Sequence, residues 1–146
     1  MRVVVQRVSS AGVTVDGKEV GKIGIGLVLL IGIAETDTEA DIEFVATKCS
    51  ELRIFQDDEG KMNRSILDVG GDILAISQFT LLGDTSKGRR PSFIKAANPD
   101  KAEQFYKIFN QMLINKRLRV ETGIFGAMMD VELTNAGPVT IIVDSK

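Results

Sequence analysis

The spacing of apolar residues along the chain limits the fold more than any other feature of the sequence. Most apolar segments are short and rich in β-branched residues, which is typical of strands. Only two segments have the spacing of an amphipathic helix, one over about residues 37–52 and one that begins at Asn98. Two helices are too few to cross over every strand of a parallel sheet. We therefore predict an α+β fold, with a mainly antiparallel sheet curled into a barrel-like core and two principal helices.

Turn signals divide the predicted strands. Asp16-Gly17 tolerates positive φ at both positions and predicts a hairpin. The continuous apolar run Leu27–Ile33 suits a strand that is covered on both faces. Near the end of the chain, the turn Asn135-Ala136-Gly137-Pro138 is expected to separate two short strands, Val131–Leu133 and Val139–Val143.

Polar residues mark where the two helices should begin. Thr36 and Glu39 have the spacing of a capping box, and Asn98-Pro99 offers an N-cap followed by proline at the first helical position. Cys49 falls on the apolar face of the first helix, which favours a packed thiol over a nucleophile. The apolar face of the second helix comprises Ala102, Phe105, Tyr106, Phe109, Met112 and Leu113.

The residue types that are missing exclude several classes of active site. The chain has no histidine and one cysteine, so Ser-His-Asp triads, Cys-His pairs, histidine metal sites and cysteine-cage zinc sites are excluded. An enzyme with this composition must use hydroxyls, carboxylates, amines, backbone groups or groups that its substrate brings. We expect neither a metal nor another cofactor. Because the net charge is -2, any contact with a polyanion must come from a local patch.

We find no segment that predicts export or membrane insertion. The longest apolar run, residues 24–34, is far shorter than the roughly 20 residues of a spanning helix. Gln6 and Arg7 interrupt the apolar N-terminal stretch too early for a signal peptide. With a lone cysteine, we expect a cytoplasmic protein whose 146 residues form a single domain over 1–146.

Ser77-Gln78-Phe79-Thr80 places two hydroxyls and an amide at the end of an apolar strand. Along a strand, Ser77 and Phe79 would face one side, and Gln78 and Thr80 the other. A strand end is a rigid support for catalytic groups. A strand that simply leaves the core would have the same residues, with threonine present for its β propensity. The motif alone leaves both interpretations open.

The segment 85–95 contains four cations and no acid in an otherwise acidic protein. Its glycine and proline predict a loop, and Phe93 offers a ring that can stack on a base. Loop cations beside hydroxyls suit contacts with phosphates. A solvated surface loop would have the same composition, so both interpretations remain. The four cations are Lys87, Arg89, Arg90 and Lys95.

Five segments of the sequence together resemble the D-aminoacyl-tRNA deacylase family, and the similarity covers essentially the whole chain. Each segment is a weak signal alone, but five in the right order are specific. None of them departs from the family pattern at a motif position. The segments are Arg2–Val8, Ser77–Leu81, Lys87–Phe93, Thr122–Met128 and Asn135–Thr140.

The resemblance implies hydrolysis of the ester between a D-amino acid and the terminal adenosine of tRNA, and removal of glycine wrongly attached to tRNA(Ala). It also implies a barrel-like α+β fold and a cytoplasmic homodimer that needs no metal, with its pocket at the subunit interface. Ser77-Gln78-Phe79-Thr80 would line that pocket, with Phe125 nearby. A cis Gly137-Pro138 peptide would reach into the partner's pocket and reject L-amino acids, braced by Arg7. The cations at 87–95 fit such a polyanionic substrate.

L and D amino acids carry the same groups, so an enzyme can separate them only by the direction in which the side chain points. A thousandfold preference needs a free-energy difference of about 4 kcal/mol between the two substrates. One methylene in an apolar pocket supplies only about 1–3 kcal/mol. Rigid backbone is the stiffest obstruction to place where an L side chain would lie, since glycine permits close approach and proline fixes φ. The sequence alone does not predict a cis Gly137-Pro138 bond, because only about 5–6% of X-Pro bonds in folded proteins are cis.

Two catalytic schemes suit these residues. Thr80 is a suitable nucleophile by type, but without histidine nothing obvious accepts its proton. We favour a scheme in which backbone N–H groups near Phe79 and Thr80 form an oxyanion site, while the 2′-hydroxyl of the ribose helps to activate or position water. The main alternative function is a non-catalytic RNA- or amino-acid-binding module with the same barrel. A small esterase that acts on free metabolites is a third.

Overall fold

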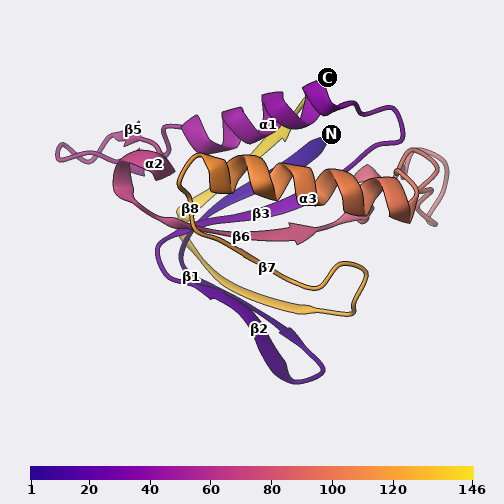
Figure 1. Cartoon of the computed structure of the whole chain (residues 1–146), viewed down its shortest axis with the longest axis horizontal. Helices are drawn as coiled ribbons and strands as arrows, with labels where there is room; N and C mark the ends of the chain where they lie inside the picture. The colour runs from indigo at the N-terminus through magenta and orange to yellow at the C-terminus, as the bar shows by residue number, and fades with distance from the viewer.

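A six-stranded sheet with two long helices packed on one face forms the body of the molecule (Figure 1). This arrangement comes from a computed structural model that describes all residues 1–146. No helix in it combines the length and the apolar character needed to cross a membrane. In chain order the elements are β1 (Arg2–Val15), β2 (Lys18–Ile23), β3 (Gly26–Gly32), α1 (Glu39–Glu51), β4 (Phe55–Gln56), β5 (Met62–Arg64), α2 (Ile66–Val69), β6 (Asp72–Ser77), the 3-10 helix η1 (Phe79–Leu82), α3 (Pro99–Asn115), β7 (Val120–Thr122) and β8 (Asp130–Asp144).

The sheet mixes antiparallel and parallel pairing. Strand β1 pairs antiparallel with β2, β3 and β8. The order continues from β3 through β6 to β7 in parallel. Strands β2 and β7, at the two ends of this order, lie against each other, so the sheet is nearly closed. The predicted α+β class and barrel-like core are confirmed. The parallel pairs were not predicted, and they need only α1 and α3 as crossovers because only two such pairs exist.

The turn that the sequence predicts at residues 135–138 does not separate two strands. Residues 130–144 make one long strand, β8, which runs beside β1 instead of folding back on itself. The pairing register passes from Gln6 opposite Thr140 to Val8 opposite Asn135. Residues 136–139 therefore bulge out opposite Arg7, and this turn-like sequence interrupts the strand without ending it. By contrast, the hairpin at Asp16-Gly17 is confirmed, with positive φ at both residues.

The first helix begins two residues later than its capping pattern predicts. Its N-cap is Thr38, whose backbone N–H and hydroxyl both donate to Asp41 Oδ2 (2.7 and 2.9 Å). Thr36 cannot serve as the N-cap of α1, because it lies within a tight turn that Asp37 closes by accepting a hydrogen bond from the N–H of Ala34 (2.7 Å). The start of α3 is as predicted, with Asn98 Oδ1 accepting from the N–H of Lys101 (3.0 Å) and proline following the cap.

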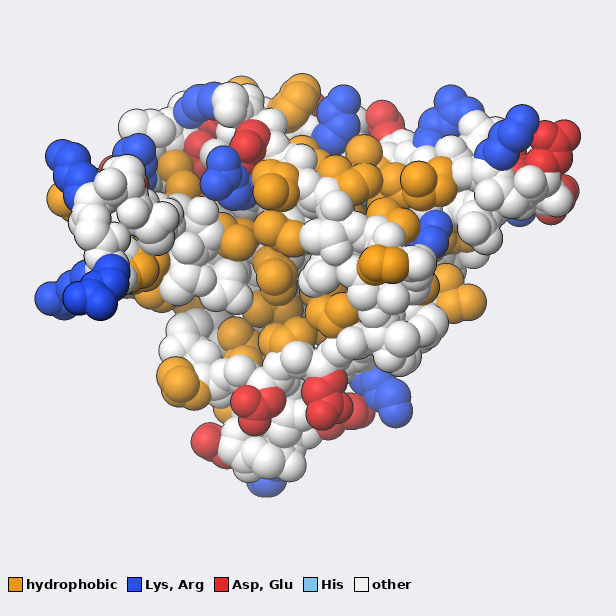
Figure 2. All heavy atoms as spheres, turned by 180° about the vertical axis from the view of Figure 1, so that it is seen from behind, with side chains coloured by type: hydrophobic (Ala, Val, Ile, Leu, Met, Phe, Trp, Pro, Cys, Tyr) orange, Lys and Arg blue, Asp and Glu red, His pale blue; other side chains and the backbone are white.

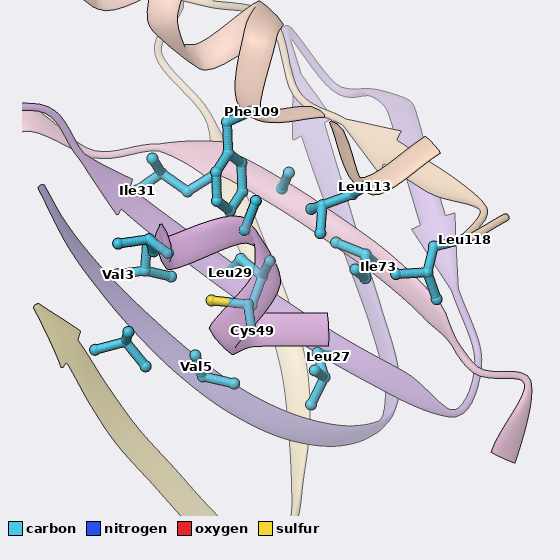
Figure 3. Close-up of a cluster of buried hydrophobic side chains, with 14 of the residues drawn as sticks. Val3, Val5, Leu27, Leu29, Ile31, Cys49, Ile73, Phe109, Leu113 and Leu118 are labelled. Atoms are coloured by element: carbon cyan, nitrogen blue, oxygen red, sulfur yellow. The ribbon is translucent and has the colours of Figure 1, made fainter. Parts of the chain in front are cut away.

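Between the sheet and the two helices lies the main hydrophobic core (Figure 3). Leu29 of β3, Phe109 of α3 and Cys49 of α1 are completely buried there. Val28, on the other face of β3, belongs to a second apolar cluster inside the curled sheet, so this strand is covered on both faces as predicted. Burial raises the pKa of the Cys49 thiol to about 12, which keeps it protonated and excludes it as a nucleophile.

Candidate functional site

Strand β6 ends at Ser77, and the chain then turns into η1 within two residues. Gln78 still donates its N–H to the Ile31 carbonyl oxygen (2.8 Å), but its φ of -144° and ψ of 79° take the backbone out of the strand. The predicted alternation of Ser77, Gln78, Phe79 and Thr80 between two faces is therefore wrong. Phe79 and Thr80 are instead the first residues of a 3-10 turn, so their N–H groups have no acceptor within that turn.

Gly32 at the end of β3 lets η1 approach the sheet this closely. A Cβ at residue 32 would overlap the Leu82 side chain and lie 3.1 Å from Leu81 Cβ and 3.3 Å from the Gln78 carbonyl oxygen. Gly32 was not predicted from the sequence, since nothing in the chain near it shows that η1 will pack on it.

The hydroxyl of Thr80 is exposed and accepts a hydrogen bond from Gln78 Nε2. An amide nitrogen cannot take a proton from an attacking hydroxyl, so this contact does not activate Thr80 as a nucleophile. No group of three or more His, Cys, Asp or Glu side chains is placed to hold a metal ion. The donors that this motif offers are the backbone N–H groups of Phe79 and Thr80, the Gln78 amide and the hydroxyls of Ser77 and Thr80.

An apolar cavity of about 620 Å³ opens beside the β6–η1 junction. Phe79 and Phe93 meet edge to face on its wall, with ring centroids 5.1 Å apart and an interplanar angle of 74°. The structure therefore brings Ser77, Gln78 and Phe79 together with the predicted pocket residue Phe125, whereas Thr80, also expected in the pocket, is not among the residues that line this cavity. The side chains that line it include Ser77, Gln78, Phe79, Phe93, Ala102, Phe125 and Met129.

Tyr106 of α3 packs against Phe125, one of the residues that line this cavity. The two ring centroids are 6.0 Å apart. Its hydroxyl donates to the Ala75 carbonyl oxygen (2.7 Å), two residues before the end of β6. Burial raises the pKa of Tyr106, so the hydroxyl stays a donor. The helical spacing predicts only that Tyr106 lies on the buried face of α3, and not that it contacts β6.

The Gly137-Pro138 peptide bond is cis, and it lies in the bulge of β8. Arg7 faces this bulge and donates from Nε to the Ala136 carbonyl oxygen (2.8 Å) and from Nη1 to the Ile54 carbonyl oxygen (2.7 Å). Gly137 has a φ of 135°, and a Cβ there would lie 2.8 Å from Arg7 Nη2. Gly137 and Pro138 are both exposed, and neither lines the cavity beside β6. Within one chain, the candidate residues therefore form two separate groups.

Residues 85–95 form an exposed loop, as predicted. Asp84 and Ser92 close its base through two backbone hydrogen bonds (2.8 and 2.9 Å). Hydrogen bonds from Ser86 hold the pKa of Asp84 below its ordinary value, so it stays ionised at the foot of the loop. All four loop cations are exposed, and none lies within ion-pair distance of a carboxylate. In Figure 2, Lys and Arg side chains project from the end of the molecule where this loop lies.

Comparison with known proteins assigns the chain to a family. The family model described as D-Tyr-tRNA(Tyr) deacylase matches residues 4–144. This chain belongs to the D-Tyr-tRNA(Tyr) deacylase family. The resemblance seen in the five sequence segments is thereby confirmed.

Similarity to individual members of the D-Tyr-tRNA(Tyr) deacylase family extends over the full length. A D-aminoacyl-tRNA deacylase of Anoxybacillus flavithermus is 63% identical over 146 residues, which is 100% of both chains. The corresponding protein of Brevibacillus brevis is 62% identical over 145 residues, 99% of this chain and 100% of its own. Among solved structures, the c-Myc DNA unwinding element binding protein is 41% identical, with a TM-score of 0.94 over 100% of this chain and 99% of that one.

Proposed function

We propose that this chain hydrolyses the ester bond of D-aminoacyl-tRNA and releases the D-amino acid and tRNA. The proposal rests on membership of the family and on full-length relatives named D-aminoacyl-tRNA deacylase, one of them 63% identical. The observation that carries it is the β6–η1 junction, which places Ser77, Gln78 and the first residue of η1, Phe79, on the wall of an apolar cavity. This hydrolysis would remove wrongly charged tRNA before translation uses it. We therefore place this proofreading activity in the cytoplasm.

The β6–η1 junction suits acyl transfer without a side-chain base. Water attacks the ester carbonyl carbon, and the oxygen that becomes negative lies against the N–H groups of Phe79 and Thr80. The carbon–oxygen bond to the 3′-oxygen of the ribose then breaks, and that oxygen takes up the proton that the water gives up. The neighbouring 2′-hydroxyl of the ribose orients the water and relays this proton. Ser77, Gln78 and Thr80 hold the substrate in place by hydrogen bonds.

Selection against L-amino acids is assigned to Gly137-Pro138 of a second copy of the chain. Both residues are exposed and lie outside the cavity of their own chain, which fits a role in a neighbouring one. Arg7 supports the segment from behind through the Ala136 carbonyl oxygen. A backbone obstruction of this kind excludes an L side chain but not glycine, which has none. Glycine attached to tRNA(Ala) is therefore a second expected substrate.

The face of the sheet turned away from α1 and α3 offers a surface for the second copy. Val4 pairs with Leu30 on one side and with Ile142 on the other, so the three side chains form one apolar row. Ile142 is 61% exposed in the single chain. Figure 2, which views the molecule from behind, shows apolar side chains gathered across its middle. A homodimer that covers this row is expected to dissociate when Ile142 is replaced by aspartate, as analytical ultracentrifugation would show.

The four loop cations are assigned to the phosphates of tRNA. They are exposed and unpaired with carboxylates, so binding a polyanion costs no existing ion pair. A small esterase that acts on free metabolites has no need of them. The loop therefore favours the tRNA ester over a small ester.

Thr80→Ala distinguishes the two catalytic schemes and tests the proposed function. If amides and the ribose do the chemistry, this variant keeps D-tyrosyl-tRNA hydrolysis with only a modest loss of rate. Complete loss of turnover with normal tRNA binding would instead support a covalent route through Thr80. A wild-type protein that binds D-tyrosyl-tRNA and never releases tyrosine would establish the binding-module alternative.

A further inference from the structure

Asn135 ties together the two ends of the β8 bulge. Its Oδ1 accepts from the N–H of Val139 (2.7 Å), on the far side of Gly137-Pro138. Its Nδ2 donates to Thr140 Oγ1 (2.9 Å), the residue at which pairing with β1 resumes. One half-buried side chain thus closes a loop around the exposed segment.

These two hydrogen bonds replace contacts that the sheet cannot supply. Across the bulge β1 offers only Arg7, whose side chain is occupied by the carbonyl oxygens of Ala136 and Ile54. The N–H of Val139 therefore relies on the Asn135 side chain, whose Oδ1 accepts from it across the bulge. Thr140 Oγ1 also lies 3.4 Å from Gln6 Nε2, which links the loop closure back to β1.

We propose that Asn135 is a positioning residue that sets the D-over-L preference, with Thr140 as its partner. This inference rests on the proposed function, in which Gly137-Pro138 obstructs the L side chain. An obstruction rejects a side chain only while it is held in place, and about 1 Å of looseness removes its effect. Arg7 fixes the segment before Gly137, and Asn135 fixes the segment after Pro138. The β6–η1 amides belong to a different element, so loosening the bulge leaves them unchanged.

The inference predicts a change in selectivity without a matching change in rate. Asn135→Ala should lower the ratio of kcat/KM for D- over L-tyrosyl-tRNA about tenfold or more, by raising L hydrolysis. Its kcat/KM for D-tyrosyl-tRNA should change less than about threefold. Thr140→Val, which keeps the shape and loses the hydroxyl, should give a smaller change in the same direction.

Asn135→Asp serves as the matched control. Its carboxylate still accepts from the N–H of Val139, and the Thr140 hydroxyl can rotate to donate to the other oxygen. Selectivity close to that of the wild type is therefore expected. A purely structural role predicts instead that all three variants lose D and L hydrolysis in proportion to their loss of stability in urea unfolding.

The inference is overturned if Asn135→Ala or Thr140→Val, folded by circular dichroism, keeps the wild-type D/L ratio or loses both activities equally. If Asn135→Ala does not fold, Thr140→Val decides the question by the same criterion. Failure of the proposed function looks different, because the wild-type protein itself would then show no hydrolysis of D-tyrosyl-tRNA or no preference for it.

Discussion

Arg7 Nε lies 2.8 Å from the carbonyl oxygen of Ala136 and donates a hydrogen bond to it. The same guanidinium reaches the Ile54 carbonyl oxygen through Nη1 (2.7 Å), so one side chain joins β1, the bulge of β8 and the segment after α1. Arginine suits this position because its planar fork presents several donors at fixed angles. The bulge is therefore held to the body of the protein by a charged group that is only partly open to water.

Replacing Arg7 by alanine should destabilise the protein and relax its selectivity. Two carbonyl oxygens lose a charged donor, which corresponds to about 1–3 kcal/mol in the free energy of unfolding. Urea unfolding measures this loss, and L-tyrosyl-tRNA hydrolysis measures the change in selectivity. Arg53→Ala is the matched control, because Arg53 also donates to a backbone carbonyl but at an exposed site. Equal effects of the two substitutions would contradict the bracing role of Arg7.

Adding a methyl group at Gly32 should displace η1 and slow the reaction. The new Cβ would overlap the Leu82 side chain, and overpacking of this kind typically costs about 1–3 kcal/mol. We expect Gly32→Ala to lower kcat about tenfold or more, with a smaller effect on KM. Gly24→Ala is the control, since a Cβ at Gly24 meets nothing within 4 Å. Wild-type kcat in Gly32→Ala would show that the position of η1 does not matter for the chemistry.

The ionisation of Tyr106 can be followed directly by absorbance, because it is the only tyrosine in a chain without tryptophan. Burial raises its pKa above the ordinary value of 10.0, so the unfolded state ionises first as pH rises. Its contribution to stability is complete below pH 10 and is lost as pH rises through the folded pKa. Tyrosinate absorbance should therefore appear at higher pH in the native protein than in urea. Coincident titration curves would place the Tyr106 hydroxyl in water.

Removing that hydroxyl tests the same contact at neutral pH. Tyr106→Phe deletes the donor to the Ala75 carbonyl oxygen and keeps the ring that packs on Phe125. We expect a loss of about 1–2 kcal/mol in the free energy of unfolding, because the Ala75 carbonyl oxygen loses a buried hydrogen bond. An unchanged denaturation midpoint would mean that the hydroxyl adds nothing to the end of β6.

Neutralising two cations of the 85–95 loop should weaken binding of tRNA and leave ester chemistry intact. For Arg89→Gln combined with Arg90→Gln, the slope of log K against log salt should fall by about 2, or about 1 for each phosphate that no longer meets a cation. The kcat for D-tyrosyl-tRNA at saturating substrate should not change. Lys61→Gln is the control, because Lys61 is exposed near β5, at the opposite end of the molecule in Figure 1. A salt dependence equal to that of the wild type would show that this loop is not part of the tRNA-binding surface of the protein.

Local signals in the sequence predicted much of the fold. Asp16-Gly17 specifies its own hairpin, and Asn98-Pro99 caps its own helix, because each depends on neighbours a few residues away. Thr36 was wrongly predicted to cap the first helix because Asp37 accepts a hydrogen bond from the N–H of Ala34 and pairs with the N-terminal ammonium group, which is distant in the sequence. The two short C-terminal strands were predicted wrongly because β8 pairs with β1, which is distant in the sequence and continues on both sides of the turn signal.

The candidate site was predictable in its parts and not in its geometry. Ser77–Phe79 and Phe125 do meet at one cavity, yet no local signal shows that η1 replaces the end of the strand. Gly32 and Tyr106 act through distant neighbours that carry no short motif. Asn135 lay within a turn signal, but its role depends on the register of β8 against β1.

The central claim is that this protein hydrolyses D-aminoacyl-tRNA and spares the L form. The most direct test measures deacylation of matched D- and L-tyrosyl-tRNA, with free tyrosine ester as the control substrate. The account predicts rapid release of D-tyrosine from tRNA and little activity on the free ester. It predicts that L-tyrosyl-tRNA is hydrolysed at least a thousandfold more slowly, which corresponds to a preference of about 4 kcal/mol. Equal rates on the two enantiomers would contradict it.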